Sequence, residues 1–155
     1  MTKQVMKRTS SDNVYLHKDF HGALSAAIEY LHRNHGADAV RDYLRQFTKT
    51  YYSPLIADVN RRGLVALKEH FESIYAVEGA PVRLTCSKDE LIVDVEWCPA
   101  VTHMRKHGYP VAELFSETTR TVNEALCENT PFSAELVSYD PQTGRSVQRF
   151  VRRQP

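Results

Sequence analysis

The hydrophobic positions in the first half of the chain recur every three or four residues, which is typical of helices with one buried face. The spacing predicts three helices. The first runs from Asp19 to Gly36, the second is kinked or broken at Pro54, and the third lies between Gly63 and Gly79. The predicted core positions of these helices include Phe20, Ala23, Leu24, Ala27, Ile28, Leu31, Val40, Tyr43, Leu44, Phe47, Leu64, Leu67, Phe71 and Ile74.

From Val82 onward the hydrophobic period falls to two, which predicts strands. Four strands form two hairpins, and two segments with helical spacing lie between them. In chain order, the first two strands are residues 82–86 and 91–97. The helical segments are 98–107 and 110–127, and the last two strands are about 132–139 and 145–152. Adjacent hairpins favour antiparallel pairing with helices packed on one face. We therefore expect an α+β fold: three N-terminal helices, then two antiparallel hairpins forming a sheet, with two further helices between them.

The composition indicates one globular domain. Of the 155 residues, 42% are hydrophobic and 25% are charged, and no internal repeat is present. Residues 1–14 are polar and lack a period, so we expect a disordered tail followed by a single domain over 15–155.

The charges and cysteines restrict the partners and the compartment. The net charge is +1, from 20 basic and 19 acidic side chains, so nothing in the totals requires nucleic acid or a membrane surface. Three cysteines, an odd count, do not make a disulfide framework and fit a reducing compartment. Since no membrane span or secretion signal is visible in the sequence, we expect a cytoplasmic protein.

The segment EWCPAVTHMRKHGYP over residues 96–110 carries the first candidate chemistry. Cys98 falls at the N-cap of a predicted helix, and Pro99 takes the first helical position. A thiol there lies near unpaired backbone N–H groups and the positive end of the helix dipole, which lower its pKa. Cys98 is thus a candidate nucleophile. The alternative is a buried cysteine that acts as a small hydrophobic residue.

The sequence predicts no metal and no cofactor. Cys98, His103 and His107 are possible ligands, but Cys98 lies about 140° around the helix from His103 and no fourth ligand is evident. Nucleotide-binding and hydrolase motifs with a fixed spacing are missing from the chain. Glu113, Glu117 and Arg120 fall on one polar stripe of the next helix, either as a partner for Cys98 or as an ordinary solvated face.

Three stretches together resemble a known family. LVALKEHFESIYAVEG, WCPAVTHMRKHGYPVAELFSETTRTVNEAL and DPQTGRSVQRF are similar to the L-2-amino-thiazoline-4-carboxylic acid hydrolase family, which is related to the 4-vinyl reductase-like small-molecule-binding domains. The resemblance covers about residues 20–152. Its specific part is the CPA at Cys98–Ala100, Gly108, and the helix that follows.

The resemblance implies a hydrolase that acts on a small cyclic C–N substrate and opens a 2-amino-thiazoline-4-carboxylate-like ring, with Cys98 at the active centre. From charge and spacing we assign proton transfer to His103 or Glu117, and binding of the substrate carboxylate to Arg120. The chain departs from the family where relatives carry cysteine, because Ser116 and Ser146 occupy those places. This departure favours the alternative of a non-catalytic small-molecule-binding domain, a sensor or carrier of the same fold.

These observations leave three hypotheses about function. The first is the hydrolase. The second is the binding domain, in which Tyr51, Tyr52 and Tyr75 would line a pocket between helices and sheet. The third is a homodimer formed through apolar surface around Phe47 and the Pro54 kink, which is compatible with either of the others.

Overall fold

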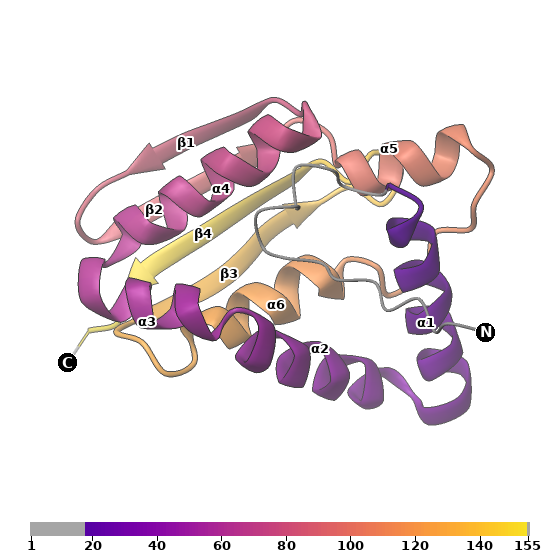
Figure 1. The fold of residues 1–155 in the computed structure, drawn as a ribbon, viewed down its shortest axis with the longest axis horizontal. Coiled ribbons are helices and arrows are strands. Elements are labelled where there is room, and N and C mark those ends of the chain that lie inside the picture. The colour runs from indigo at the N-terminus through magenta and orange to yellow at the C-terminus, as the bar shows by residue number, and fades with distance from the viewer. Residues whose placement is uncertain (1–17, 155) are drawn as a thin grey trace, which may run out of the picture.

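The computed structural model describes residues 18–154, and Figure 1 shows their arrangement. The predicted tail 1–14 lies outside the described residues. The helices are α1 (Phe20–His35), α2 (Ala37–Tyr51), α3 (Ser53–Arg62), α4 (Leu64–Glu78), α5 (Pro99–Lys106) and α6 (Glu117–Cys127). The strands are β1 (Val82–Cys86), β2 (Glu90–Val95), β3 (Phe132–Tyr139) and β4 (Ser146–Arg152). The predicted α+β class is confirmed.

The four strands form one antiparallel sheet in the order β1-β2-β4-β3. Each predicted hairpin forms, β1 with β2 and β3 with β4, and the two hairpins join where β2 pairs with β4. Helices α4 and α6 cover one face of the sheet (Figure 1). Leu91, Val93 and Val95 of β2 are buried beneath these helices, whereas the alternate residues Ile92 and Asp94 face outward.

The interior consists of two hydrophobic clusters. The first, here called the sheet cluster, joins the sheet to α3, α4 and the end of α6, and its members include Val59, Leu67, Phe71, Leu91, Val93, Leu126, Phe132 and Phe150. The second, the helical cluster, joins α1, α2, α5 and the segment before α6, and its members include Ile28, Val40, Leu44, Val101, Met104 and Phe115. Val122 of α6 packs against both clusters.

The prediction of three N-terminal helices is wrong in one respect, because residues 18–79 form four. The chain breaks at Tyr52, and Pro54 takes a place in the first turn of α3. Proline is tolerated there because the first helical N–H groups have no intrahelical partner. The break separates α2 from α3 instead of merely bending one helix.

The predicted helix over 110–127 is also shorter than expected, since α6 begins only at Glu117. Residues 110–112 are instead held against α1 by Ser25. The Ser25 hydroxyl donates to the Pro110 carbonyl oxygen at 2.9 Å and accepts from the Ala112 N–H at 2.8 Å. These hydrogen bonds satisfy backbone groups that a helix would otherwise have used.

Two smaller expectations are wrong as well. Phe20 was expected on the buried stripe of α1, but its side chain is 60% exposed. The strand predicted over 91–97 ends at Val95. The Glu96 N–H still donates to the Pro81 carbonyl oxygen opposite, but proline has no N–H to donate in return, and the Cys98 N–H donates to Thr143 instead. In residues 18–154, no helix is both long enough and apolar enough to cross a membrane.

Candidate functional site

Cys98 occupies the predicted N-cap position of α5, and Pro99 is the first residue of that helix. The β3–β4 turn holds the Cys98 backbone in place, because the Cys98 N–H donates to the Thr143 carbonyl oxygen of that turn at 2.9 Å. Gly144 of the same turn lies directly against it: a Cβ atom added to Gly144 would overlap the Cβ of Cys98. The backbone at Cys98 is thus fixed by close packing against a turn about 45 residues away in the chain.

The environment of the Cys98 thiol differs from the prediction. Burial raises the pKa of Cys98, and the N–H groups of Val101 and Ala100, which act in the opposite sense, do not offset it. The N–H groups at the helix N-terminus lower this pKa as expected, but desolvation outweighs them, so the net shift is upward and the expected reactive thiol is not favoured.

Two tyrosines and one carboxylate lie near this thiol. Burial raises the pKa of Tyr139 to about 12 and raises the pKa of Tyr75 strongly. The negative charge that an ionised Cys98 would carry adds to both increases. Glu78 in turn raises the pKa of both Tyr75 and Cys98. Burial and Glu78 thus oppose the formation of a thiolate at Cys98, and burial keeps the two tyrosine hydroxyls protonated. The surroundings of Cys98 hold neutral hydroxyl and thiol groups beside one acidic group.

The structure gives His103 different neighbours. Its Nε2 atom lies 3.1 Å from Asp19 Oδ1, at the N-terminus of α1. His103 and His107 share one face of α5, as expected, with ring centroids 4.1 Å apart. His103 therefore links α5 to the start of α1.

Glu117 is buried, with 2% of its side chain exposed, so the expected solvated face is wrong at this position. Its Oε2 accepts a hydrogen bond from Thr121 at 2.6 Å, and its Oε1 lies 3.4 Å from Arg41 and 3.4 Å from Arg120. The proposed carboxylate-binding Arg120 is thus already engaged with Glu117. This group joins α2 to α6.

Among residues 18–154, no hydrogen bond or ion pair joins Cys98, His103 and Glu117 to one another. Each of the three is held by a different part of the fold. Only Glu117 and Arg120, which lie on adjacent turns of one helix, are in contact. The assigned roles of these residues remain predictions.

A different set of residues forms a groove. A hollow of about 370 Å³ lies among α1, α2 and α6 and is predominantly apolar. Its lining consists of Phe20, His21, Leu24, Tyr43, Leu44, Phe47, Tyr51, Tyr52, Thr118 and Val122. The rings of Phe47 and Tyr51 stack at 5.2 Å, and Tyr52 meets Tyr51 edge to face at 4.9 Å. This aromatic groove has the size and chemistry of a small-molecule site.

Two buried polar atoms, one on a residue that lines the aromatic groove and one on a residue behind it, have no hydrogen-bond partner. They are His21 Nε2 and Glu78 Oε2. His21 lines the groove from the first turn of α1, and Nε2 lies 3.6 Å from Glu78 Oε1 at the end of α4. The Glu78 side chain is 9% exposed, and the His21 side chain is 17% exposed. Buried polar atoms normally have partners, so an exception suggests a group that binds there.

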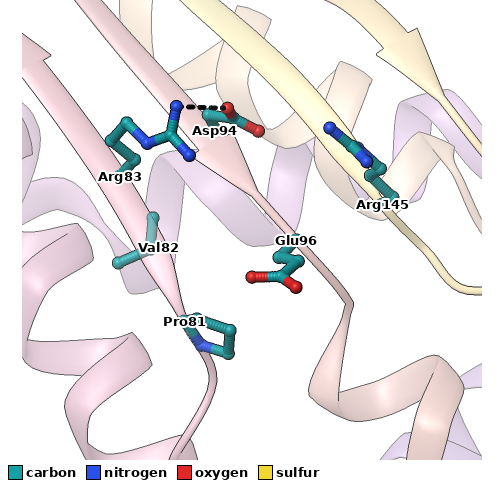
Figure 2. A pocket seen from close by; sticks show the side chains of 6 residues that line it. All are labelled: Pro81, Val82, Arg83, Asp94, Glu96 and Arg145. Atoms are coloured by element: carbon teal, nitrogen blue, oxygen red, sulfur yellow. Dashed lines mark ion pairs between the residues drawn. The ribbon is translucent and has the colours of Figure 1, made fainter.

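A second hollow, of about 380 Å³, lies on the outward face of the sheet (Figure 2). Figure 2 shows Arg83 paired with Asp94 across β1 and β2, and Glu96 and Arg145 beside them. The nitrogen and oxygen atoms of the Arg83–Asp94 pair are 3.9 Å apart, and the Arg83 side chain is 83% exposed. Because solvent screens such charges, this hollow is a weaker candidate than the aromatic groove.

Sequence analysis missed His21 and Glu78. Neither lies in a motif, and the two residues are 57 positions apart in the chain, on α1 and α4. One signal was present: Glu78 ends a helix, where the dipole disfavours a negative charge, so its position is not explained by helix stability. Of the tyrosines expected to line a pocket, Tyr51 and Tyr52 line the aromatic groove, and Tyr75 lies near Cys98 instead.

Ser116 and Ser146, which the resemblance aligns with cysteines of the family, are both part of the framework of the fold. Ser146 is buried on β4 and accepts a hydrogen bond from Gln148 at 3.1 Å, and Gln148 accepts one from Asn123 at 2.7 Å. Ser116 is the N-cap residue of α6. Among residues 18–154, no group of three His, Cys, Asp or Glu side chains is arranged to hold a metal ion.

Comparison with known proteins adds no assignment. No protein-family model matches the chain, and no curated protein matches it. The resemblance to the L-2-amino-thiazoline-4-carboxylic acid hydrolase family is therefore still a prediction.

Proposed function

We propose that this chain is a small-molecule-binding domain whose ligand lies in the aromatic groove between α1, α2 and α6. The observation that carries the proposal is the groove itself: a predominantly apolar hollow of about 370 Å³ lined by aromatic side chains, with His21 and Thr118 among its few polar residues. An apolar pocket with a few polar groups is the usual form of a ligand site. The apolar lining supplies affinity and the polar atoms supply orientation.

The state of Cys98 favours binding over covalent catalysis. A nucleophilic cysteine reacts as the thiolate, and burial raises the pKa of this thiol. His103, the base assigned from the sequence, is paired with Asp19 instead. A domain that encloses a ligand without converting it needs neither group.

A thermal-shift screen with small organic molecules of varied charge tests this proposal. A ligand that binds only the folded state raises the melting temperature. Thr118→Phe places a ring in the groove, and we expect it to abolish the shift while the protein still folds. Thr119→Phe is the matched control, because Thr119 is the adjacent residue and does not line the groove. Equal shifts in both variants would place the ligand elsewhere and remove the proposal.

The predicted hydrolase is the second candidate. It rests on the tyrosine hydroxyls near Cys98, which could donate a proton to a leaving group. Its test is ring opening of 2-amino-thiazoline-4-carboxylate by wild type and by Cys98→Ser. If the variant reacts at the parent rate, the thiol has no catalytic role.

The predicted homodimer stays a further proposal. Tyr43, Phe47 and Tyr51 follow one another at four-residue intervals on α2, and their side chains are 44%, 39% and 64% exposed. This aromatic stripe borders the groove, so a second copy bound there would compete with a ligand or cover it. Light scattering gives the oligomeric state.

A further inference from the structure

A further hollow, of about 750 Å³, has a positively charged lining. It lies where the α3–α4 turn, the β1–β2 turn, the segment before β3 and the end of β4 meet, at one end of the molecule (Figure 1). Every charged side chain in its lining is basic, and we call it the basic hollow. These side chains are Arg61, Arg62, Lys68, Lys88 and Arg152.

The floor of the basic hollow is apolar. Val59, Leu64 and Phe132 line it and are almost completely buried. The guanidinium carbon of Arg152 lies 4.8 Å from the centre of the Phe132 ring, so the charged rim directly adjoins the apolar floor. The volume is within the range of sites for small organic molecules. A molecule that fills this hollow therefore contacts hydrocarbon at its base and cations at its rim.

Four of the five basic side chains have acidic partners that lie outside the hollow. The ion pairs are Arg61–Asp58, Arg62–Asp58, Arg62–Glu69, Lys68–Glu72 and Arg152–Asp89. None of these carboxylates is part of the lining, and each paired side chain remains at least 24% exposed. Exposed ion pairs contribute little to stability, so these cations can turn toward a ligand at small cost.

Lys88 is the basic residue of the lining without an acidic partner. It is exposed in the β1–β2 turn, and no carboxylate of residues 18–154 forms an ion pair with it. The lining thus has five cations, and four carboxylates pair with them, which leaves one positive charge in excess. An anion that enters the hollow compensates this charge.

We propose that the basic hollow binds a small organic anion, a carboxylate or phosphate with an apolar body, at a site separate from the aromatic groove. The anionic group accepts hydrogen bonds from Lys88 and the neighbouring arginines at the rim. The apolar body covers Leu64 and Phe132. Lysine and arginine side chains are the usual partners of carboxylate and phosphate groups in proteins.

Calorimetric titration at low ionic strength tests this inference with four probes: phenyl phosphate, benzoate, phenol and inorganic phosphate. We expect phenyl phosphate to bind wild type at least about tenfold more tightly than phenol, which lacks the charge, and than inorganic phosphate, which lacks the apolar body. Benzoate should lie between phenyl phosphate and phenol, because it carries a single negative charge. The inference fails if no probe binds, or if neither acid binds more tightly than phenol.

A pair of lysine variants tests the position of the site. Lys88→Glu should weaken phenyl phosphate binding about tenfold, because it removes one attraction and adds one repulsion. Lys106→Glu is the matched control: Lys106 is exposed on α5, lies outside the hollow and changes the net charge equally. It should weaken binding less than about twofold, since solvent screens distant charges. Equal effects would show that only the overall charge matters and would overturn the inference.

The Thr118→Phe variant separates this site from the aromatic groove. Thr118 lines the groove and not the basic hollow, so this substitution should leave phenyl phosphate binding unchanged. If it abolishes binding, the anion lies in the aromatic groove and the inference fails while the proposed binding function stands. The thermal-shift screen decides the aromatic groove independently of these titrations.

Discussion

Burial distinguishes the three cysteine thiols at the scale of the single residue. Cys86 and Cys98 are both partly exposed, and burial raises the pKa of each, whereas Cys127 is buried and its pKa rises to about 12. Cys98 is enclosed by the β3–β4 turn and α5. We expect iodoacetamide at pH 7 to alkylate Cys86 first, since access and thiolate content both set the rate.

Peptide mass spectrometry after short exposure measures the order of labelling, and the same reaction in urea provides the fully reactive control. Cys98 and Cys127 should be labelled quickly only in urea. Preferential labelling of Cys98 in the folded protein would contradict the pKa direction and restore the case for a nucleophile.

Glu117 gives a second prediction at this scale. Removing its carboxylate by Glu117→Ala leaves Thr121 without its partner and separates Arg41 of α2 from α6. We expect the free energy of unfolding to fall by about 2 to 4 kcal/mol, as when one partner of a buried hydrogen-bonded charge is lost.

Urea unfolding measures this change. Glu124→Ala, an exposed position on the same helix, should change the free energy of unfolding by no more than about 0.5 kcal/mol. Similar values for the two variants would show that Glu117 does not hold α2 against α6.

At the scale of elements, the β3–β4 turn and the start of α5 fit together through a glycine. Gly144 has a φ of 68°, and an added Cβ would overlap Cys98. We expect Gly144→Ala to lower the free energy of unfolding by about 2 to 5 kcal/mol, from backbone strain together with overpacking.

Gly79→Ala separates the two causes. Gly79 also has a φ of 68°, but nothing lies within 4 Å of its added Cβ. Its substitution should cost only the backbone strain, about 1 to 2 kcal/mol. If both variants lose the same stability in urea unfolding, contact between the turn and Cys98 contributes nothing.

The elements also show what the sequence could predict. The hydrophobic period and the turn-forming residues predicted both hairpins and the position of Cys98 ahead of Pro99, because these features depend on neighbours in the chain. The late start of the helix predicted over 110–127 depends on Ser25, which is 85 positions away from Pro110. The pairing of His21 with Glu78 likewise depends on how α1 packs near α4. Contacts of this kind have no local signal, so the candidate site could not be predicted while most of the fold could.

At the scale of the whole molecule, surface carboxylates contribute stability that depends on pH. Five have a pKa below the ordinary value, in each case mainly because a neighbouring side chain donates a hydrogen bond; they are Glu29, Asp58, Glu69, Glu128 and Asp140. A lowered folded-state pKa means that the unfolded chain binds protons first as the pH falls. Their stabilisation is complete above about pH 5, the upper side of the ordinary carboxyl range, and is lost as the pH falls through the folded values.

We therefore expect the urea midpoint to decrease as the pH is lowered from about 5 to 3. Added salt should reduce the decrease, since most of these groups are exposed and their charges are screened. A midpoint that stays constant to pH 3 would contradict the lowered pKa values.

The division of the interior into two clusters has a consequence for cooperativity. The sheet lies entirely in one cluster, while α1, α2 and α5 are held in the other, and Val122 belongs to both. The aromatic groove spans this boundary, because Tyr52 packs with the sheet cluster and Leu24 with the helical cluster. A molecule that fills the groove couples the two parts, so occupancy sharpens the unfolding transition as well as shifting it.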